Sequence, residues 1–360
     1  MSDQLSAREA KWLAAHGPLD LERHGDLRRL LGRHPRDGKT TFSKHELVRG
    51  YRALCQQGKL TFQRETLRRL QMKPTRTLSG VAPVTVLTAS APCPGECIFC
   101  PDDARMPKSY LADEPGAMRG LYHQFDPFQQ TAARIRALEN IGHPTDKIEL
   151  LVLGGTWSAY KDDYQEWFVR RCLDAMNERP ASSLRQAQTW NEIAPHRNVG
   201  LVIETRPDRV TPEEVLRLRR LGVTKVQLGV QSLDDAILVA NQRGHSVEQT
   251  RQAVRLLRLG GFKIAVHWMP NLLGVTPESD RGDFRRLWDD PALRPDELKI
   301  YPCVLLAGTA LHEHWQRGAY RPYDEQILIQ LVADCKALVP PYCRINRVTR
   351  DIPAPNIVAG

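Results

Sequence analysis

The sequence predicts an α/β protein, a full or partial (β/α) barrel that follows a basic helical module. From about residue 82, short apolar, β-prone runs alternate with amphipathic helical stretches. Such alternation is typical of βαβ units on a parallel sheet. The residues before this point lack those runs and carry the whole excess of basic charge. We therefore divide the chain into a helical module at 1–80 and a barrel domain at 81–360.

Residues 1–80 are predicted to be helical and to face a polyanion. Apolar residues recur at helical spacing over 43–60 and 62–72, and Pro74 ends the second stretch because proline cannot continue a helix. The module holds 17 basic and 8 acidic side chains, whereas the rest of the chain holds 34 of each. Phosphate contacts by Lys and Arg drive nucleic-acid affinity through counterion release. A solvated, Arg-rich helical surface is the alternative.

The barrel domain is predicted to contain at least six strand–helix units. Active sites in such folds lie at the carboxyl ends of the strands. Every predicted strand ends in glycine or polar residues, which a purely structural barrel would not need. The predicted strands are 84–88, 148–153, 199–204, 225–230, 263–268 and 298–301, and the helices include 127–141, 162–177, 212–221, 247–259 and 324–338.

Three of the eight cysteines, Cys93, Cys97 and Cys100, lie within eight residues after the first predicted strand. In a chain without a secretory signal, this pattern indicates metal binding rather than a disulfide framework. Three thiolates at this spacing can ligate three irons of a four-iron cluster and leave the fourth iron open to a substrate. A chance grouping or an incomplete zinc site is the alternative. The five scattered cysteines are interpreted as core residues.

The bulk composition is that of a globular protein without a membrane partner. Hydrophobic residues make up 41% of the chain and charged residues 26%, which is ordinary for soluble domains. No apolar run approaches the roughly 20 residues that a membrane span needs. The amino terminus lacks the basic-then-apolar pattern of a secretory signal. We expect a cytoplasmic location.

The Cys-x-x-x-Cys-x-x-Cys motif after the first strand, with Gly-Gly after the second, resembles the radical S-adenosylmethionine (radical SAM) superfamily. The resemblance implies a radical SAM-type partial (β/α) barrel. It also implies two cofactors, a [4Fe-4S] cluster and S-adenosyl-L-methionine, which the open iron chelates. In that superfamily, one electron from the cluster cleaves the sulfonium and releases a 5′-deoxyadenosyl radical. The protein supplies orientation and excludes solvent.

Eight ordered motifs further resemble the catalytic subunit of Elongator, and the match covers about residues 43–360. That family modifies carbon 5 of the wobble uridine of tRNA, using the radical to activate the methyl group of acetyl-CoA. The resemblance thus implies a tRNA uridine carboxymethyltransferase-type acyltransferase. The motifs are KPTRTLSGVAPVTVLT (73–88), SYLADEPGAMRG (109–120), GHPTDKIELLVLGGT (142–156), IETRPD (203–208), LGVQS (228–232), NQRGH (241–245), RPDELKIYP (294–302) and RDIPAPNIVAG (350–360).

The resemblance also implies roles for individual residues. Cys93, Cys97 and Cys100 match the cluster ligands, and Lys147 matches a lysine associated with acetyl-CoA. Lys73 and Arg76 are candidates for tRNA phosphates. For each non-cysteine candidate, a structural role such as a turn glycine, a salt-bridged barrel rim or a surface charge is the alternative. The cofactor-binding candidates are Gly154, Gly155, Thr156 and Gln231, and the candidates lining the radical pocket are Glu204, Arg206, Gln231, Lys299 and Tyr301.

The family's chain continues past the position of Gly360 into an acetyltransferase-type domain. We therefore expect a truncated form, an acetyl group supplied by a separate acetyltransferase-domain protein or other Elongator-like subunits, or a different reaction. Two further readings stay open. One is a non-catalytic tRNA-binding or scaffold subunit, and the other is a radical enzyme with another substrate.

Overall fold

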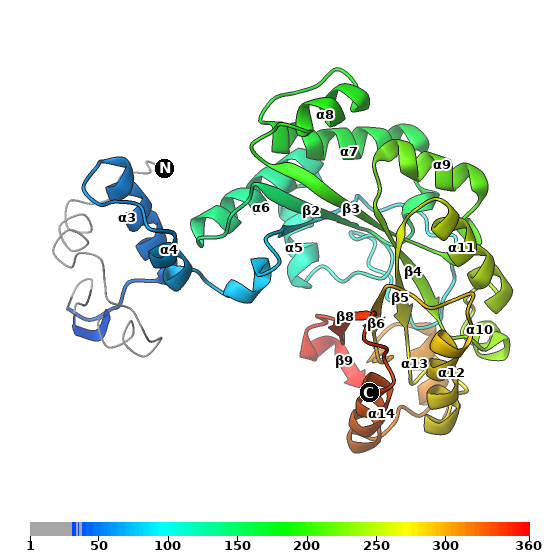
Figure 1. Cartoon of the computed structure of the whole chain (residues 1–360). Coiled ribbons are helices and arrows are strands. Elements are labelled where there is room, and N and C mark those ends of the chain that lie inside the picture. Colours follow the sequence, from blue (N-terminus) through cyan, green and yellow to red (C-terminus); the bar gives the residue numbers. More distant parts are fainter. Residues whose placement is uncertain (1–30, 34, 36–37) are drawn as a thin grey trace. The chain divides into compact units, whose positions relative to one another are not determined.

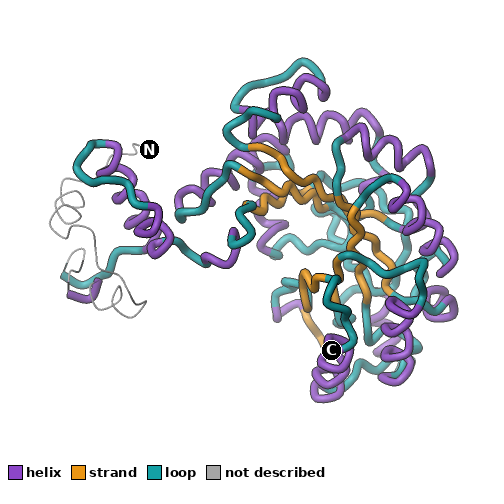
Figure 2. The backbone as a smooth tube through the Cα atoms, in the orientation of Figure 1, coloured by secondary structure: helices purple, strands orange, loops and turns teal. Residues whose placement is uncertain are grey.

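The computed structural model describes residues 31–33, 35 and 38–360. The described chain forms two compact units, traced in Figures 1 and 2. The first unit contains the residues up to Val84 together with 132–148 and 195–197, and the second contains 85–131, 149–194 and 198–360. The first 30 residues of the predicted module lie outside the described residues.

The first unit contains two helices of the predicted basic module. They are α3 (Lys44–Gln56) and α4 (Arg64–Leu70). Ser43 and Glu46 form a capping box that satisfies backbone donors at the start of α3. Both helices are shorter than the predicted stretches, and α3 ends where the left-handed Gly58 directs the chain into a turn. A small core joins them, made of Leu31, Phe42, Leu47, Val48, Tyr51 and Leu70.

Buried His143 holds the segment after α4 in place within this unit. Its Nε2 lies 2.8 Å from the carbonyl oxygen of Met72, while its Nδ1 lies 2.6 Å from Gln71 Nε2 and 2.8 Å from Thr77 Oγ1. Nε2–H therefore donates and Nδ1 accepts, which defines one neutral tautomer. Burial lowers the pKa of His143, in agreement with that form. The anchored segment includes the short turn η1 (Pro74–Thr77).

A seven-stranded sheet carries the candidate site, in the order β1-β2-β3-β4-β5-β6-β8. The pairs from β3 onward are parallel. Because β1 and β8 are edges, the barrel is open, and the predicted partial (β/α) barrel is confirmed. The strands are β1 (Ala82–Leu87), β2 (Lys147–Leu153), β3 (Arg197–Thr205), β4 (Lys225–Gln231), β5 (Lys263–Trp268), β6 (Glu297–Ile300) and β8 (Arg344–Val348).

Helices of the second unit cover the outer side of the sheet, where Figure 1 shows α7, α9 and α11. Every residue of β4 is buried, so the core follows the centre of the sheet. The helices of this unit are α5 (Pro115–Tyr122), α7 (Asp162–Asn177), α8 (Leu184–Asn191), α9 (Pro212–Leu221), α10 (Asp235–Ala240), α11 (Val247–Leu259), α12 (Pro277–Asp289), α13 (Ala310–Gln316) and α14 (Glu325–Ala337). Helix α6 (Pro127–Asn140) begins in the second unit and continues in the first.

The carboxyl-terminal part contains strands that the sequence pattern did not reveal. The seventh strand, β8, is an edge strand whose residues are exposed or half-buried, so it lacks an apolar run. Two short strands, β7 (Leu305–Leu306) and β9 (Ile357–Ala359), pair antiparallel in a separate sheet. Within the described residues, every helix is too short or too polar to cross a lipid bilayer.

Candidate active site at the carboxyl ends of the strands

The sheet gathers polar side chains from successive strands at one edge. Glu204 lies near the end of β3, Gln231 ends β4, and Lys299 lies in β6. Because the strands are parallel, these positions share the carboxyl-terminal edge. The cysteine loop follows β1 directly. By contrast, Lys147 opens β2 with an exposed side chain, at the strand end opposite Gly154 and Gly155.

Within the cysteine loop, Cys97 is buried and faces two guanidinium groups. Arg243 Nη1 donates a hydrogen bond to Cys97 Sγ at 2.8 Å, and Arg206 Nη1 lies 4.0 Å from the same sulfur. A hydrogen bond with Cys100, followed by these two positive charges, lowers the pKa of Cys97 to about 5. Cys97 is therefore a thiolate at neutral pH, the form that ligates metal.

The two arginines are themselves fixed by hydrogen bonds. Arg206 Nε donates to Asp208 at 2.8 Å, and its Nη2 donates to the carbonyl of Arg243 at 2.5 Å. Arg243 Nη2 in turn donates to the carbonyl of Gly229 at 2.5 Å. Arg206 was predicted as a site residue, whereas Arg243 was not. Its place within the NQRGH motif was the available signal.

The donor set fits an iron–sulfur cluster. Three thiols lie on one loop, and two buried cations face the most buried of them. No three His, Cys, Asp or Glu side chains of the described residues are arranged for a single metal ion. A cluster instead places each thiolate on a different iron. The buried Gln231, at a left-handed φ of 71°, has an Oε1 without a hydrogen-bond partner in the described chain, as a site that awaits a ligand donor would.

Gly154 is required by its packing against the end of β1. Its φ is +144°, and a Cβ there would lie 1.7 Å from Thr88 Oγ1. Gly155 also has a positive φ, and the next residue, Thr156, places its Oγ1 3.6 Å from Cys93 Sγ. The structure thus brings the Gly-Gly turn to the cysteine loop. Contact of these three residues with the cofactor stays a prediction.

A second group of buried polar residues surrounds Glu204. This carboxylate accepts a hydrogen bond from Tyr110 Oη at 3.1 Å and lies 3.2 Å from His267 Nδ1. On the other side, His267 Nε2 lies 3.2 Å from Gln227 Oε1, to which Lys299 Nζ also donates. The Tyr301 ring meets the His267 ring edge-on, with centroids 5.5 Å apart.

The structure thus brings the predicted residues Glu204, Lys299 and Tyr301 together. It adds Tyr110, Gln227 and His267, which sequence reasoning did not select. Gln227 and His267 both lie inside predicted strands, where a polar residue at an inward position was the available signal. Tyr110 lies on a loop, and its place within the SYLADEPGAMRG motif was the available signal.

Burial controls the charges in this second group. It lowers the pKa of His267 well below its usual value, helped by the positive charges of Lys299 and Arg350. The lowered pKa favours the neutral imidazole, whose single ring N–H can donate either to Glu204 from Nδ1 or to Gln227 from Nε2. Burial also lowers the pKa of Lys299 to about 8 and raises that of Tyr301 to about 12. Lys299 can consequently exchange a proton near neutral pH.

The two predicted tRNA-contacting residues lie in the first unit. Lys73 is exposed and adopts a left-handed φ of 50° immediately before η1. Arg76 is half-buried within that turn. Both belong to the segment anchored by His143, so their backbone positions are defined within the unit.

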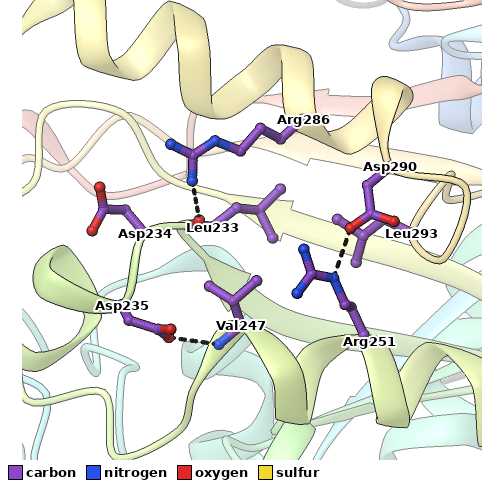
Figure 3. Close-up of a pocket in the computed structure, with 8 residues that line it drawn as sticks. All are labelled: Leu233, Asp234, Asp235, Val247, Arg251, Arg286, Asp290 and Leu293. Carbon is purple, nitrogen blue, oxygen red and sulfur yellow. Dashed lines mark hydrogen bonds and ion pairs between the residues drawn. The ribbon is translucent and has the colours of Figure 1, made fainter.

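A cavity of about 280 Å³ lies near α10, α11 and α12 (Figure 3). Arg251 Nε donates to Asp290 at 2.7 Å, Arg286 donates to the carbonyl of Leu233, and Asp235 accepts from the backbone of Val247. These groups are already paired within the protein, and we assign the cavity no catalytic role. Its lining comprises Leu233, Asp234, Asp235, Val247, Arg251, Arg286, Asp290 and Leu293.

Comparison with known families matches the barrel to a named superfamily. Residues 90–287 match the profile of the Radical SAM superfamily. Residues 295–360 match the Radical SAM C-terminal domain. The first match covers more than half of the chain and includes the cysteine loop and strands β2 to β5.

Curated relatives carry tRNA-modification and Elongator names. The tRNA uridine(34) acetyltransferase of Methanocaldococcus infernus is 49% identical over 297 residues, which cover 81% of this chain and 56% of that protein. Its namesake from Dehalococcoides mccartyi is 47% identical, with 80% and 63% covered. Elongator complex protein 3 of Homo sapiens is 37% identical, with 81% and 55% covered. The chain thus spans little more than half the length of these relatives.

A solved structure supports the same relationship. The archaeal Methanocaldococcus infernus Elp3 with an N-terminal deletion superposes with a TM-score of 0.68 at 44% sequence identity. The superposition covers 78% of this chain and 59% of that one. The resemblance drawn from the sequence motifs is thereby confirmed.

Proposed function

The chain belongs to the radical SAM superfamily, and we propose that it is the radical-generating part of an enzyme that modifies the wobble uridine of tRNA. The observation that carries this proposal is the cysteine loop, in which the buried sulfur of Cys97 faces two guanidinium groups. The names of the relatives supply the substrate class. The Radical SAM match over residues 90–287 includes the cysteine loop.

In this proposal, each group at the strand ends has a distinct task. Cys93, Cys97 and Cys100 would hold the cluster, while Gly155, Thr156 and Gln231 would bind S-adenosylmethionine. When bound, the two cofactors supply a 5′-deoxyadenosyl radical. The buried groups around Glu204 would orient the substrates and exclude water. Among them, Lys299, with its pKa lowered to about 8, can release or regain a proton, whereas Tyr301, with its pKa raised to about 12, keeps its proton beside His267.

We further propose acetyl-CoA as the co-substrate whose methyl group is activated. Lys147 is the candidate contact on this chain. A separate acetyltransferase-domain protein or other Elongator-like subunits are the proposed partners. The exposed place of Lys147 at the opposite end of β2 is compatible with contact to a large co-substrate or a partner at that end.

The test is release of 5′-deoxyadenosine by the anaerobically reconstituted protein, with reductant and S-adenosylmethionine, in the presence or absence of tRNA and acetyl-CoA. We expect release that rises when tRNA is added and requires all three cysteines. No release from protein that carries a full four-iron cluster, with every substrate present, would contradict the proposal. It would favour a tRNA-binding role.

The tRNA assignment has its own test in the first unit. Replacing Lys73 and Arg76 by Gln should weaken tRNA binding about equally for different tRNA sequences. It should also reduce the slope of log affinity against log salt by about 1 per lost phosphate contact. Replacing exposed Lys263 at the start of β5 serves as the matched control. An unchanged salt slope in the double variant would remove these two residues from the interface.

A further inference from the structure

We propose that Arg243 is a positioning residue that makes the cluster easier to reduce, through its hydrogen bond to the sulfur of Cys97. This inference rests on the proposed cluster at Cys93, Cys97 and Cys100. It concerns the side chains around Cys97, one of the three proposed cluster ligands.

Arg243 is a buried cation whose hydrogen bonds go to a sulfur and a carbonyl oxygen rather than to a carboxylate. Its side chain is only 5% exposed, it donates to Cys97 Sγ and to the Gly229 carbonyl, and its Nε has no partner in the described chain. A buried charge is costly unless an opposite charge compensates it. The group that the site places against this cation is the Cys97 sulfur, 2.8 Å from Arg243 Nη1, together with whatever that sulfur ligates.

The position of Arg243 is tied to the cysteine loop at two points. Besides the contact with Cys97, the backbone N–H of Ile98 donates to the carbonyl of Asn241 at 3.3 Å. The Asn241 side chain is fixed in turn by the carbonyls of Ile237 and Leu273, each at 2.9 Å. The guanidinium is therefore held over one particular sulfur by the fold, and not by a flexible contact.

The three cysteines have unequal surroundings. Cys97 receives the direct hydrogen bond of Arg243, with Arg206 as a second cation at 4.0 Å. Cys93 has a neutral hydroxyl, Thr156 Oγ1, at 3.6 Å. Reduction adds one negative charge to the cluster, and hydrogen bonds to the sulfurs help to set cluster potentials. A buried cation next to a ligand sulfur stabilises the more negative, reduced state, so Arg243 should raise the reduction potential.

Redox titration of the reconstituted full chain, monitored by electron paramagnetic resonance of the reduced cluster, tests this inference. The variants are Arg243→Gln and Arg243→Lys, and Arg251→Gln is the matched control because Arg251 pairs with Asp290 away from the cysteines. We expect Arg243→Gln to lower the equilibrium constant for reduction at least tenfold, which is about 59 mV for a one-electron couple. The reduction potential of Arg243→Lys should lie between those of the parent and Arg243→Gln, and that of the control should equal the parent's.

Iron content and the paramagnetic signal of the parent protein distinguish failure of the proposed function from failure of the tuning role of Arg243. A parent chain without a four-iron cluster contradicts the proposed function itself. A parent with a cluster, whose potential is unchanged in Arg243→Gln, overturns the tuning role alone. If Arg243→Gln does not load iron, the reduction potential of Arg243→Lys is compared with that of the parent instead, and an unchanged potential overturns the tuning role. Failure of both folded variants to load iron also overturns tuning, and would assign Arg243 to cluster assembly instead.

Discussion

The two buried polar groups at the strand ends differ in how their charges are balanced. Around Glu204, the polypeptide supplies both donors and acceptors, since Tyr110 and His267 meet the carboxylate and Gln227 meets Lys299. Around Cys97, the guanidinium of Arg243 meets a sulfur and a carbonyl. The first group thus pairs its charges mainly within the polypeptide, whereas the second holds buried cations against a sulfur. In the proposed function, this difference corresponds to a substrate-orienting group and a cofactor-binding group.

The largest expected effect comes from removing the Cys97 sulfur, which the two cations of the second group face. Cys97→Ala should abolish stoichiometric iron binding, because a cluster held by two thiolates on this loop loses its most strongly stabilised ligand. Cys55→Ser, in the first unit, should keep the full iron content. Iron and sulfide analysis with optical absorption measures both. A Cys97→Ala protein that retains four irons per chain would show that the cations face a different anion.

The next largest effect concerns Lys299, in the group around Glu204. Burial lowers the pKa of Lys299 to about 8, so protonated Lys299 is less favourable in the native state than in the unfolded chain. This penalty is full below the native pKa and disappears as the pH rises above the unfolded value of about 10.4. At pH 7, Lys299→Met should therefore raise the free energy of unfolding by about 3 kcal/mol.

Denaturant unfolding of the apo protein at pH 7 and at pH 10 measures this difference. The stability gain of Lys299→Met should shrink at the higher pH, while 5′-deoxyadenosine release should fall at both. Exposed Lys161, replaced by Met, is the control and should show no pH-dependent gain. A loss of stability at pH 7 would mean that the Gln227 hydrogen bond outweighs the cost of burying the charge.

A third effect tests how closely the cations pack on the cysteine loop. A Cβ at Gly95 would lie 2.1 Å from Arg206 Nη1, and Arg206 is only 5% exposed. Gly95→Ala should displace this guanidinium and destabilise the apo protein by roughly 1–3 kcal/mol. Gly282→Ala, where no atom lies within 4 Å, should be neutral or stabilising. Equal melting temperatures for both variants would indicate that Arg206 moves aside without cost.

The smallest expected effect concerns the surroundings of Cys93 rather than those of Cys97. Thr156→Val removes the hydroxyl near Cys93, whose contact of 3.6 Å is neutral and long. The cluster potential should therefore move by less than it does in Arg243→Gln, and the iron content should stay full. The same redox titration measures both variants. A larger shift of the cluster potential in Thr156→Val than in Arg243→Gln would mean that the contact at Cys93, and not the one at Cys97, has the greater influence on the cluster.

The sequence predicted the six principal strands and the cysteine loop because these features are local. Strands β2 to β6 have buried apolar residues that appear as short runs, and the cysteines are close together in the chain. It did not predict β8, whose edge position requires no apolar run. Arg243 and Tyr110 were missed because they meet their partners Cys97 and Glu204 across 146 and 94 residues. Such pairings depend on the strand order and not on local spacing.

The contacts of His143 have a consequence for folding kinetics. The hydrogen bonds that fix the segment around Lys73 join residues 66 to 72 positions apart in the sequence. Closing a loop of that length has an entropic cost that local helix formation does not have. Helices α3 and α4 can therefore form early from neighbouring residues, whereas η1 acquires its native position only after the chain around His143 has docked. The conformation of Lys73 should consequently be among the last features of this unit to appear during refolding.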